Sequence, residues 1–252
     1  MTARLAHIVR HPIKSLGWEE LRAVEVDAGR VLPFDRLWAL AHEAAAFDGD
    51  PGGWHAKRNF VRGVASPPLM AIRAEMLDSG QRLRLTHPDR PPLELDPDSP
   101  EATPAVIAWV APLWPATRPA PARLVSAGDQ AMTDVEKPFV SVLNLASLED
   151  LGRRMGRALS IHRFRGNLWL DGLSPWAESD WIGREIRIGD ARLRIERPIT
   201  RCNATKADPE TGREDGDTLG ALEAAFGHRE FGTYARVLEG GKLTVGDPVE
   251  VS

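Results

Sequence analysis

Short runs of alternating apolar and polar residues recur through both halves of this chain, separated by proline, glycine or polar residues. This period of two residues is typical of half-buried β-strands. In the first part of the sequence we expect strands over residues 5–10, 22–26, 37–42, 69–77, 82–86 and 93–95. The letters "DSGQ" at residues 78–81 predict a hairpin turn, because glycine readily adopts a positive φ. A chain so rich in strands disfavours an all-parallel β/α fold.

The second part of the sequence also favours strands, here mixed with helices. We expect strands over residues 138–145, 167–170, 185–188, 192–196, 233–238 and 242–245, and helices over residues 101–111, 147–159 and 217–227. Ser147 and Asp150 match a capping box, which would begin the middle helix. Pro198 makes a regular central strand unfavourable at its position. The proline-rich segment 118–129 is the best boundary, so we expect a mainly β, α+β chain with domains 1–122 and 123–252.

Composition narrows the classes of protein to which the chain can belong. The sequence has 252 residues, 42% of them apolar, which is enough for a sizeable core. Its one cysteine, Cys202, excludes an internal disulfide and a four-cysteine metal site. No segment resembles a signal peptide or approaches the roughly 20 apolar residues of a membrane span, so we expect a soluble cytoplasmic protein. The net charge of −4 disfavours binding to nucleic acid.

Four polar clusters follow or precede expected strands and could bind an anion or a metal. Familiar nucleotide-binding, hydrolase and metalloprotease motifs do not occur. Solvated turns or strand edges would show the same local patterns, so the local sequence leaves both interpretations open. If "HRFRGN" is extended, its polar side chains lie on one side of a strand. The clusters comprise Lys14 and Ser15; Arg36; Arg163, Arg165 and Asn167; and Thr200, Arg201 and Cys202.

The thiol of Cys202 has two interpretations from its surroundings alone. Free cysteine can be a small apolar group that packs in a core, or a thiolate that binds a soft metal or reacts with a substrate. Arg201 precedes it and "DPETG", residues 208–212, turns the chain soon afterwards. Pro198 favours irregular backbone here, and functional groups are often displayed on such backbone. Local chemistry leaves the two interpretations balanced.

Two long segments carry a resemblance to a known family. The stretch "IVRHPIKSLGWEELRAVEVDAGRVLPFDRLWAL" resembles the N-terminal β-barrel domain that precedes MOSC domains (molybdenum cofactor sulfurase C-terminal). The stretch "FRGNLWLDGLSPWAESDWIGREIRIGDARLRIERPITRCNATKADPETG" resembles a MOSC domain. The family includes the mitochondrial amidoxime-reducing components and bacterial counterparts, which bind molybdenum cofactor and reduce N-hydroxylated compounds. The resemblance implies an antiparallel, barrel-like N-terminal domain packed against a MOSC β-barrel domain with a few helices.

The resemblance also implies roles for individual residues. Cys202 matches the cysteine that ligates molybdenum and is the catalytic residue. The substrate would be a small N-hydroxylated molecule, and electrons would come from a separate flavin, haem or iron–sulfur protein. No nucleic-acid or membrane partner is expected. The positions that match cofactor-binding residues are Lys14, Ser15, Arg36, Ser147, Arg165, Asn167, Thr200 and Arg201.

Two other functions are compatible with the same resemblance. MOSC domains also occur in molybdenum cofactor sulfurases, so the chain could carry sulfur as a persulfide on Cys202 or hand cofactor to another enzyme. Pyridoxal phosphate is linked to the family only by that association, and no aminotransferase-like domain is found in this sequence. The third possibility is a binding module that retains the cofactor without turnover.

Overall fold

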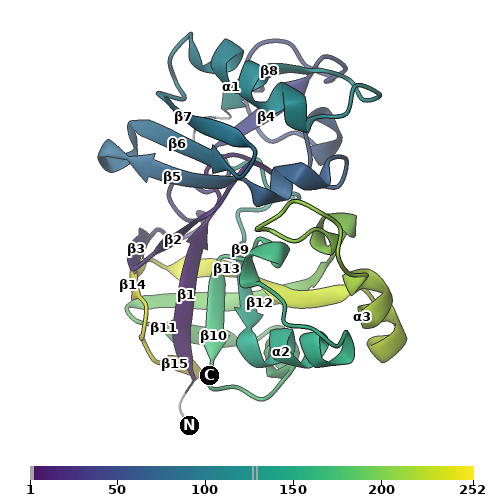
Figure 1. The fold of residues 1–252 in the computed structure, drawn as a ribbon. Helices are drawn as coiled ribbons and strands as arrows, with labels where there is room; N and C mark the ends of the chain where they lie inside the picture. Colours follow the sequence, from purple (N-terminus) through teal and green to yellow (C-terminus); the bar gives the residue numbers. More distant parts are fainter. Residues whose placement is uncertain (1–2, 127, 129) are drawn as a thin grey trace.

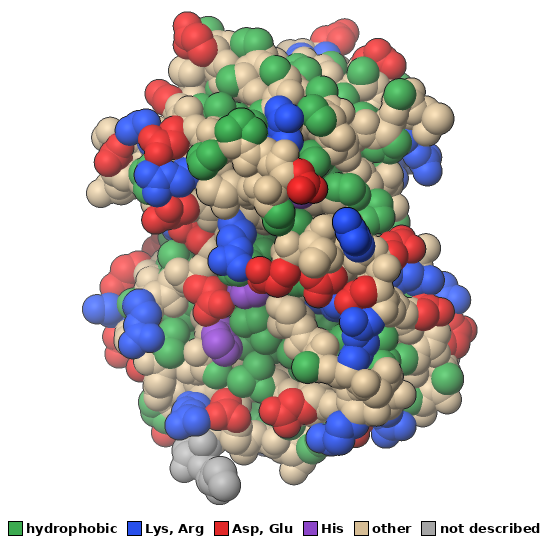
Figure 2. Space-filling model, in the orientation of Figure 1, with side chains coloured by type: hydrophobic (Ala, Val, Ile, Leu, Met, Phe, Trp, Pro, Cys, Tyr) green, Lys and Arg blue, Asp and Glu red, His purple; other side chains and the backbone are tan. Residues whose placement is uncertain are grey.

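The structure, a computed structural model, describes residues 3–126, 128 and 130–252. It has two parts that meet at a waist, with the large sheet and one two-stranded sheet in the lower part and the other smaller sheets in the upper part (Figure 1). The mainly β fold is confirmed, and three α-helices accompany the strands in the described residues. Figure 2 shows basic and acidic side chains interspersed over the visible face. Among the described residues, no helix has the length and apolar character needed to cross a membrane.

The large sheet has eight strands and combines both ends of the sequence. Its order is β15-β11-β12-β13-β9-β10-β1-β2, with β15 and β2 as its edges in the described residues. Only β9 and β10 pair in parallel there, and the first strand pairs antiparallel with β10. The strands are β1 Arg4–Arg10, β2 Glu19–Leu21, β9 Val140–Asn144, β10 Leu168–Asp171, β11 Glu185–Ile188, β12 Ala191–Thr200, β13 Glu230–Glu239 and β15 Val249–Val251.

The smaller sheets complete the β structure. The expected hairpin is confirmed, since residues Asp78–Gly80 join β5 to β6. The expectation of a strand from residue 69 is wrong, because Pro67–Ala71 forms a 3-10 helix (η2) and the strand begins at Arg73. Two prolines at its start lack the N–H groups that a sheet would need. The pairs are β3 Ala23–Val26 with β14 Gly241–Thr244 and β4 Trp38–His42 with β8 Pro121–Ser126; β5 Arg73–Leu77, β6 Arg82–His87 and β7 Arg90–Leu95 form the third sheet.

The helices lie close to their expected positions, with one correction. They are α1 Ala102–Val110, α2 Leu145–Arg154 and α3 Thr218–Phe226. Helix α2 begins before Ser147, because the side chain of Asn144 accepts from the Ala146 amide and caps the helix. It ends before residue 159, since Gly156 has a φ of +67°. Asp217 caps α3 as expected.

The expectation that Pro198 disfavours a regular central strand agrees with its place in the sheet, but the strand is longer than the expected 192–196. Strand β12 continues through Pro198 to Thr200, with irregular register at residues 198–200. Its pairing with β11 ends at Arg194, so Pro198 faces a partner strand on the β13 side alone. A missing N–H group is tolerated at such an edge. Cys202 therefore follows directly from the end of a sheet strand.

Separate buried clusters stabilise the two parts. Apolar side chains from β1, β9 to β13 and β15 fill one face of the large sheet. A second cluster packs α1 against the upper sheets. A third lies between the large sheet and helices α2 and α3, and it includes Phe164, Trp169 and Phe231. The domain boundary at residues 122 and 123 stays a prediction.

Candidate functional site

A cavity of about 280 Å³ is lined by residues from both parts of the molecule. Small-molecule sites usually measure about 300–1,000 Å³, so this cavity is just below that range. Eight of the nine residues predicted for the site line it: Lys14, Ser15, Arg36, Arg165, Asn167, Thr200, Arg201 and Cys202. Ser147 is not among the lining residues. Its buried hydroxyl donates to Glu178 at 2.9 Å and accepts from the Trp176 amide at 2.8 Å.

The turn after β1 is held beside the segment that precedes β4. The backbone N–H of Lys14 donates to Trp38 O at 2.8 Å, and that of Arg36 donates to His11 O at 2.6 Å. The N–H of His11 donates to Asp35 Oδ1 at 2.8 Å. These contacts fix two basic side chains, 22 positions apart in sequence, at the same cavity.

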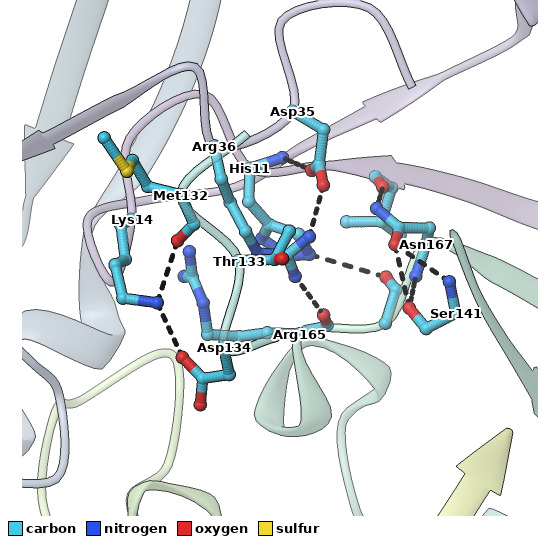
Figure 3. A network of polar contacts seen from close by, with 12 residues as sticks. His11, Lys14, Asp35, Arg36, Met132, Thr133, Asp134, Ser141, Arg165 and Asn167 are labelled. Atoms are coloured by element: carbon cyan, nitrogen blue, oxygen red, sulfur yellow. Dashed lines mark hydrogen bonds and ion pairs between the residues drawn. The ribbon is translucent and has the colours of Figure 1, made fainter. Parts of the chain in front are cut away.

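Lys14 is a buried cation that binds Met132 and Asp134 (Figure 3), and a second lysine shares the carboxylate of Asp134. Its Nζ donates to Met132 O at 2.9 Å and to Asp134 Oδ1 at 2.6 Å. Lys57 Nζ donates to the other carboxylate oxygen at 3.2 Å. Burial lowers the pKa of Lys14, although Asp134 opposes this change. Burial alone would raise the pKa of Asp134, but the two lysines hold it well below its usual range.

A second network connects Arg36 with Arg165 (Figure 3). Arg36 pairs with the buried carboxylate of Asp35 through Nη1, and its Nη2 donates to the carbonyl of Arg165 at 2.8 Å. The guanidinium of Arg165 donates to Gly17 O at 2.9 Å and to Ile13 O at 3.4 Å. Arg36 thus holds the backbone at Arg165, and Arg165 holds the backbone of the turn after β1.

Two cavity arginines bind carbonyl oxygens rather than carboxylates. The guanidinium of Arg201 donates to Phe231 O at 2.6 and 2.8 Å and to Phe164 O at 2.7 Å. Within the described part of the chain, neither Arg165 nor Arg201 lies at ion-pair distance from a carboxylate. Burial and the charge of Arg36 lower the pKa of Arg165 to about 9, and burial lowers that of Arg201 to about 10. An anion in the cavity would relieve this uncompensated positive charge.

Three residues that line the cavity have left-handed backbone conformations. The φ angles are +63° at Ser15, +52° at Arg36 and +48° at Arg165. Such conformations cost roughly 1 kcal/mol or more for residues other than glycine, and they persist only where surrounding contacts impose them. Strain of this kind is concentrated at functional sites. The backbone around the cavity is therefore held in conformations that lower the stability of the folded protein.

The segment "HRFRGN" is not extended, so the condition that would place its polar side chains on one side of a strand does not apply. Residues Ile161–Phe164 form a 3-10 helix (η5), and the left-handed Arg165 turns the chain into β10. The guanidinium of the buried Arg163 points to the segment after Cys202, where it donates to Lys206 O at 3.1 Å and pairs with Asp215 at 2.8 Å. Arg163 thus holds the cysteine segment in place, while Arg165 holds the N-terminal turn.

Cys202 is exposed and lies just before a 3-10 helix (η7), Asn203–Lys206. The amide and the hydroxyl of Thr205 both donate to the carbonyl of Cys202, at 3.1 and 3.0 Å. The thiol is thus displayed on a fixed turn at the cavity rather than packed in a core. Of the two interpretations of this cysteine, the geometry removes the buried apolar filler.

Asn167 lines the cavity, but both ends of its side-chain amide are hydrogen-bonded to the protein itself. Its Oδ1 accepts from the Ser141 hydroxyl at 2.8 Å and from the Ser141 amide at 3.2 Å, and its Nδ2 donates to Val9 O at 3.1 Å. These bonds join β1, β9 and the start of β10. Asn167 therefore fixes the strand ends from which the basic side chains extend.

Sequence reasoning missed two charged residues of the cavity, Asp134 and Arg62. Both line it, and their sequence neighbourhoods contain no recognisable motif. The stretch "WHAKRNF", residues 54–60, resembles a variant of bacterial family members and leaves open whether Lys57 or Arg58 lines the pocket; the structure places Lys57 in the lining. The charge balance is strongly positive, since the described lining has one acidic residue, Asp134, against seven basic ones. The basic residues are Lys14, Arg36, Lys57, Arg62, Arg163, Arg165 and Arg201.

Comparison with known proteins gives matches over both parts of the chain. Residues 2–111 match the profile of the MOSC N-terminal beta barrel domain, and residues 129–250 match that of the MOSC domain. Mitochondrial amidoxime-reducing component 1 of Mus musculus is 36% identical over 133 residues, which are 48% of this chain and 38% of that relative. Molybdenum cofactor sulfurase of Anopheles gambiae is 37% identical over 75 residues, 29% of this chain and 10% of that relative.

One solved structure is similar over the whole chain. The crystal structure of the YUAD protein from Bacillus subtilis has a TM-score of 0.48 and 12% identity, and the match covers 100% of this chain and 96% of that one. The two family profiles together leave few residues unmatched, and they occur in the order that the sequence resemblance implies. The chain therefore belongs to the MOSC domain family, with a MOSC N-terminal beta barrel domain ahead of its MOSC domain.

Proposed function

We propose that this protein binds molybdenum cofactor in the cavity and reduces N-hydroxylated compounds with electrons from a separate donor protein. The observation that carries the proposal is the excess of positive charge around an exposed thiol. A pterin phosphate is an anion that forked or clustered donors hold well, and molybdenum is a metal that accepts a soft thiolate ligand. The residues of the cavity fit both requirements.

The basic residues would hold the anionic part of the cofactor. Lys14, Arg36 and Arg165 converge through the networks around Asp134 and Asp35. The hydroxyl of Ser15 supplies a further donor in the same turn. Because their backbone is fixed before any ligand arrives, these donors lose little freedom on binding. Preorganised charge of this type favours both affinity and a single orientation of the bound group.

Cys202, which follows Thr200 and Arg201 directly, would hold the metal end of the cofactor. Thr205 and Arg163 fix the backbone of the cysteine turn from which the thiol extends. When bound, the cofactor supplies the two-electron chemistry of the reaction R–NHOH + 2e⁻ + 2H⁺ → R–NH₂ + H₂O. The exposed Lys57 contacts Asp134 Oδ2 through Nζ at 3.2 Å, opposite the oxygen that Lys14 binds. Asn167 keeps the neighbouring strand ends in register.

The proposal is tested by activity of protein purified from a host that makes the cofactor. We expect reduction of benzamidoxime with dithionite-reduced methyl viologen as an artificial donor, and loss of that activity in Cys202→Ala. Full activity in Cys202→Ala, or no activity in protein that contains molybdenum, would contradict it. We place the protein in the cytoplasm as part of the same proposal.

A second function is favoured by the exposure of Cys202 and by the sulfurase relatives. A thiol on an open turn could accept a persulfide from a cysteine desulfurase and pass the sulfur or the cofactor to another enzyme. Mass spectrometry after incubation with a desulfurase and cysteine would detect a gain of one sulfur atom on Cys202. Its absence would remove this alternative and leave the reductase proposal unaffected.

A further inference from the structure

Arg62 differs from the other basic residues of the cavity in its contacts. Lys14 and Lys57 pair with Asp134, and the remaining arginines of the lining bind carboxylates or backbone carbonyls. Arg62 lines the same cavity and is half-buried, yet its guanidinium has no hydrogen-bond or ion-pair partner within residues 3–126, 128 and 130–252. A half-buried guanidinium of this kind has donors available for a ligand.

The backbone on both sides of Arg62 is fixed. The amide of the fully buried Val61 donates to Leu40 O at 2.8 Å, and the carbonyl of Arg62 accepts from Ala65 N at 3.0 Å. A Cβ atom built on Gly63 would lie 2.6 Å from Met70 Sδ, so this turn packs closely against η2. The side chain of Arg62 therefore extends from a rigid point, which lowers the entropy lost when it binds a ligand.

The same turn lies beside the cysteine segment. The Cβ position at Gly63 is 3.9 Å from the Cβ of Ala204, two residues after Cys202. Arg62 thus reaches the cavity from backbone that borders the thiol. If the proposed function holds, a substrate binds near Cys202. The guanidinium of Arg62 can then interact with that substrate.

We propose that Arg62 recognises a carboxylate or phosphate group on the substrate, so that the protein prefers N-hydroxylated compounds that carry a negative charge. This inference rests on the proposed function and names its substrate class. The planar fork of arginine matches both kinds of anion with two parallel hydrogen bonds. Carboxylates and phosphates both present negatively charged oxygens. Kinetics with substrates that carry one group or the other shows which of the two Arg62 prefers.

The test compares benzamidoxime with 4-carboxybenzamidoxime, which differ by one carboxylate. We expect kcat/KM to be about tenfold higher for the acid, which is what one charge-assisted hydrogen bond is worth. In Arg62→Met we expect the kcat/KM values of the two substrates to become nearly equal, mainly because the KM of the acid rises. A phosphonate analogue shows whether phosphate-like groups are preferred to carboxylates.

Arg58→Met is the matched control. Arg58 is exposed, carries the same charge four residues away and is not part of the cavity lining. We expect its substitution to leave both kcat/KM values unchanged. A ratio near one in the wild type, or a ratio that persists in Arg62→Met, would overturn the inference. Loss of molybdenum and pterin from Arg62→Met would also overturn it, because Arg62 would then serve the cofactor.

Binding of products keeps the inference testable if the proposed function fails. Should the molybdenum-loaded protein reduce neither amidoxime, calorimetric titration with benzamidine and 4-amidinobenzoate gives the comparison without turnover. Tighter binding of the acid, lost in Arg62→Met and kept in Arg58→Met, supports a site for anionic ligands. Equal binding of the two compounds would reject it.

Discussion

The left-handed conformation of Ser15 shows how single residues shape the cavity. Its φ of +63° is imposed by the contacts of the turn after β1. We expect Ser15→Gly to raise the free energy of unfolding by roughly 1 kcal/mol, because glycine adopts this conformation without strain. The same change removes a hydroxyl donor, so the content of bound cofactor should fall. Urea denaturation and pterin analysis measure the two effects.

Ser79→Gly is the control for that substitution. Ser79 has a φ of +56° and lies in the turn between β5 and β6, outside the cavity lining. It should gain similar stability with no change in cofactor content. A loss of cofactor in both variants would mean that the effect of Ser15→Gly comes from altered stability and not from the missing hydroxyl.

A buried histidine determines part of the dependence of stability on pH. His162 stacks on Trp18 with ring centroids 3.3 Å apart, and its Nε2 lies 3.1 Å from Glu20. Burial lowers the pKa of His162 to about 4, against the ordinary 6.5. The folded protein therefore resists protonation between pH 6.5 and 4 while the unfolded chain takes up the proton. Stability from the neutral ring is present above pH 6.5 and is lost as the pH falls to about 4.

His162→Phe keeps an aromatic ring against Trp18 and removes this titration. We expect the fall in Tm between pH 7 and pH 4 to be smaller in this variant than in the wild type. Substitution of the exposed His228 by Gln should leave the wild-type slope unchanged. An unaltered slope in His162→Phe would show that other groups cause the acid destabilisation.

At the scale of elements, the turn after Cys202 connects the two parts of the molecule. Gly212 has a φ of +67°, and a Cβ atom there would lie 2.7 Å from the Cα of Pro68 in η2. We expect Gly212→Ala to destabilise the protein by about 2–3 kcal/mol, from backbone strain together with overpacking. Chemical denaturation measures the change.

Gly183→Ala separates the two causes. Gly183 has a φ of +85°, and a Cβ atom there would meet no atom of the described chain within 4 Å. It should lose about 1 kcal/mol, from strain alone. Equal losses in the two variants would contradict the close contact between the cysteine segment and η2.

Much of the secondary structure followed from sequence patterns, and the misses have physical causes. The alternation in β1, β6 and β11 and the cap of α3 were enough to place those elements. The start of α2 was missed because Asn144 caps it, while the hydroxyl of Ser147 binds Glu178. The extension of β12 past residue 196 was missed because pairing with β11 has ended there, which the local sequence does not record.

The candidate site was predictable where residues belong to a motif and not elsewhere. Lys14, Ser15 and Cys202 lie in segments that resemble the family. Asp134 reaches Lys14 across 120 positions in sequence, and no local pattern records such a contact. Arg62 was missed for the same reason, since its place in the cavity depends on how η2 packs.

At the scale of the whole molecule, the two parts are interleaved. Strand β1 pairs with β10, and β3 pairs with β14 near the other end of the sequence. The cavity likewise draws residues from both parts. We expect calorimetry to show one cooperative unfolding transition that moves up by several degrees on loading with cofactor, since a ligand that binds only the folded state stabilises all of it. Two separate transitions, with only one responding to cofactor, would contradict this coupling.

The central claim is that the cavity binds molybdenum cofactor through its basic residues and Cys202. The most direct test is the amount of molybdenum and pterin per polypeptide in protein purified from a cofactor-producing host. We expect close to one of each in the wild type, and much less of both in Lys14→Met and Arg165→Met that remain folded by circular dichroism. Folded wild-type protein that contains neither molybdenum nor pterin would contradict the account.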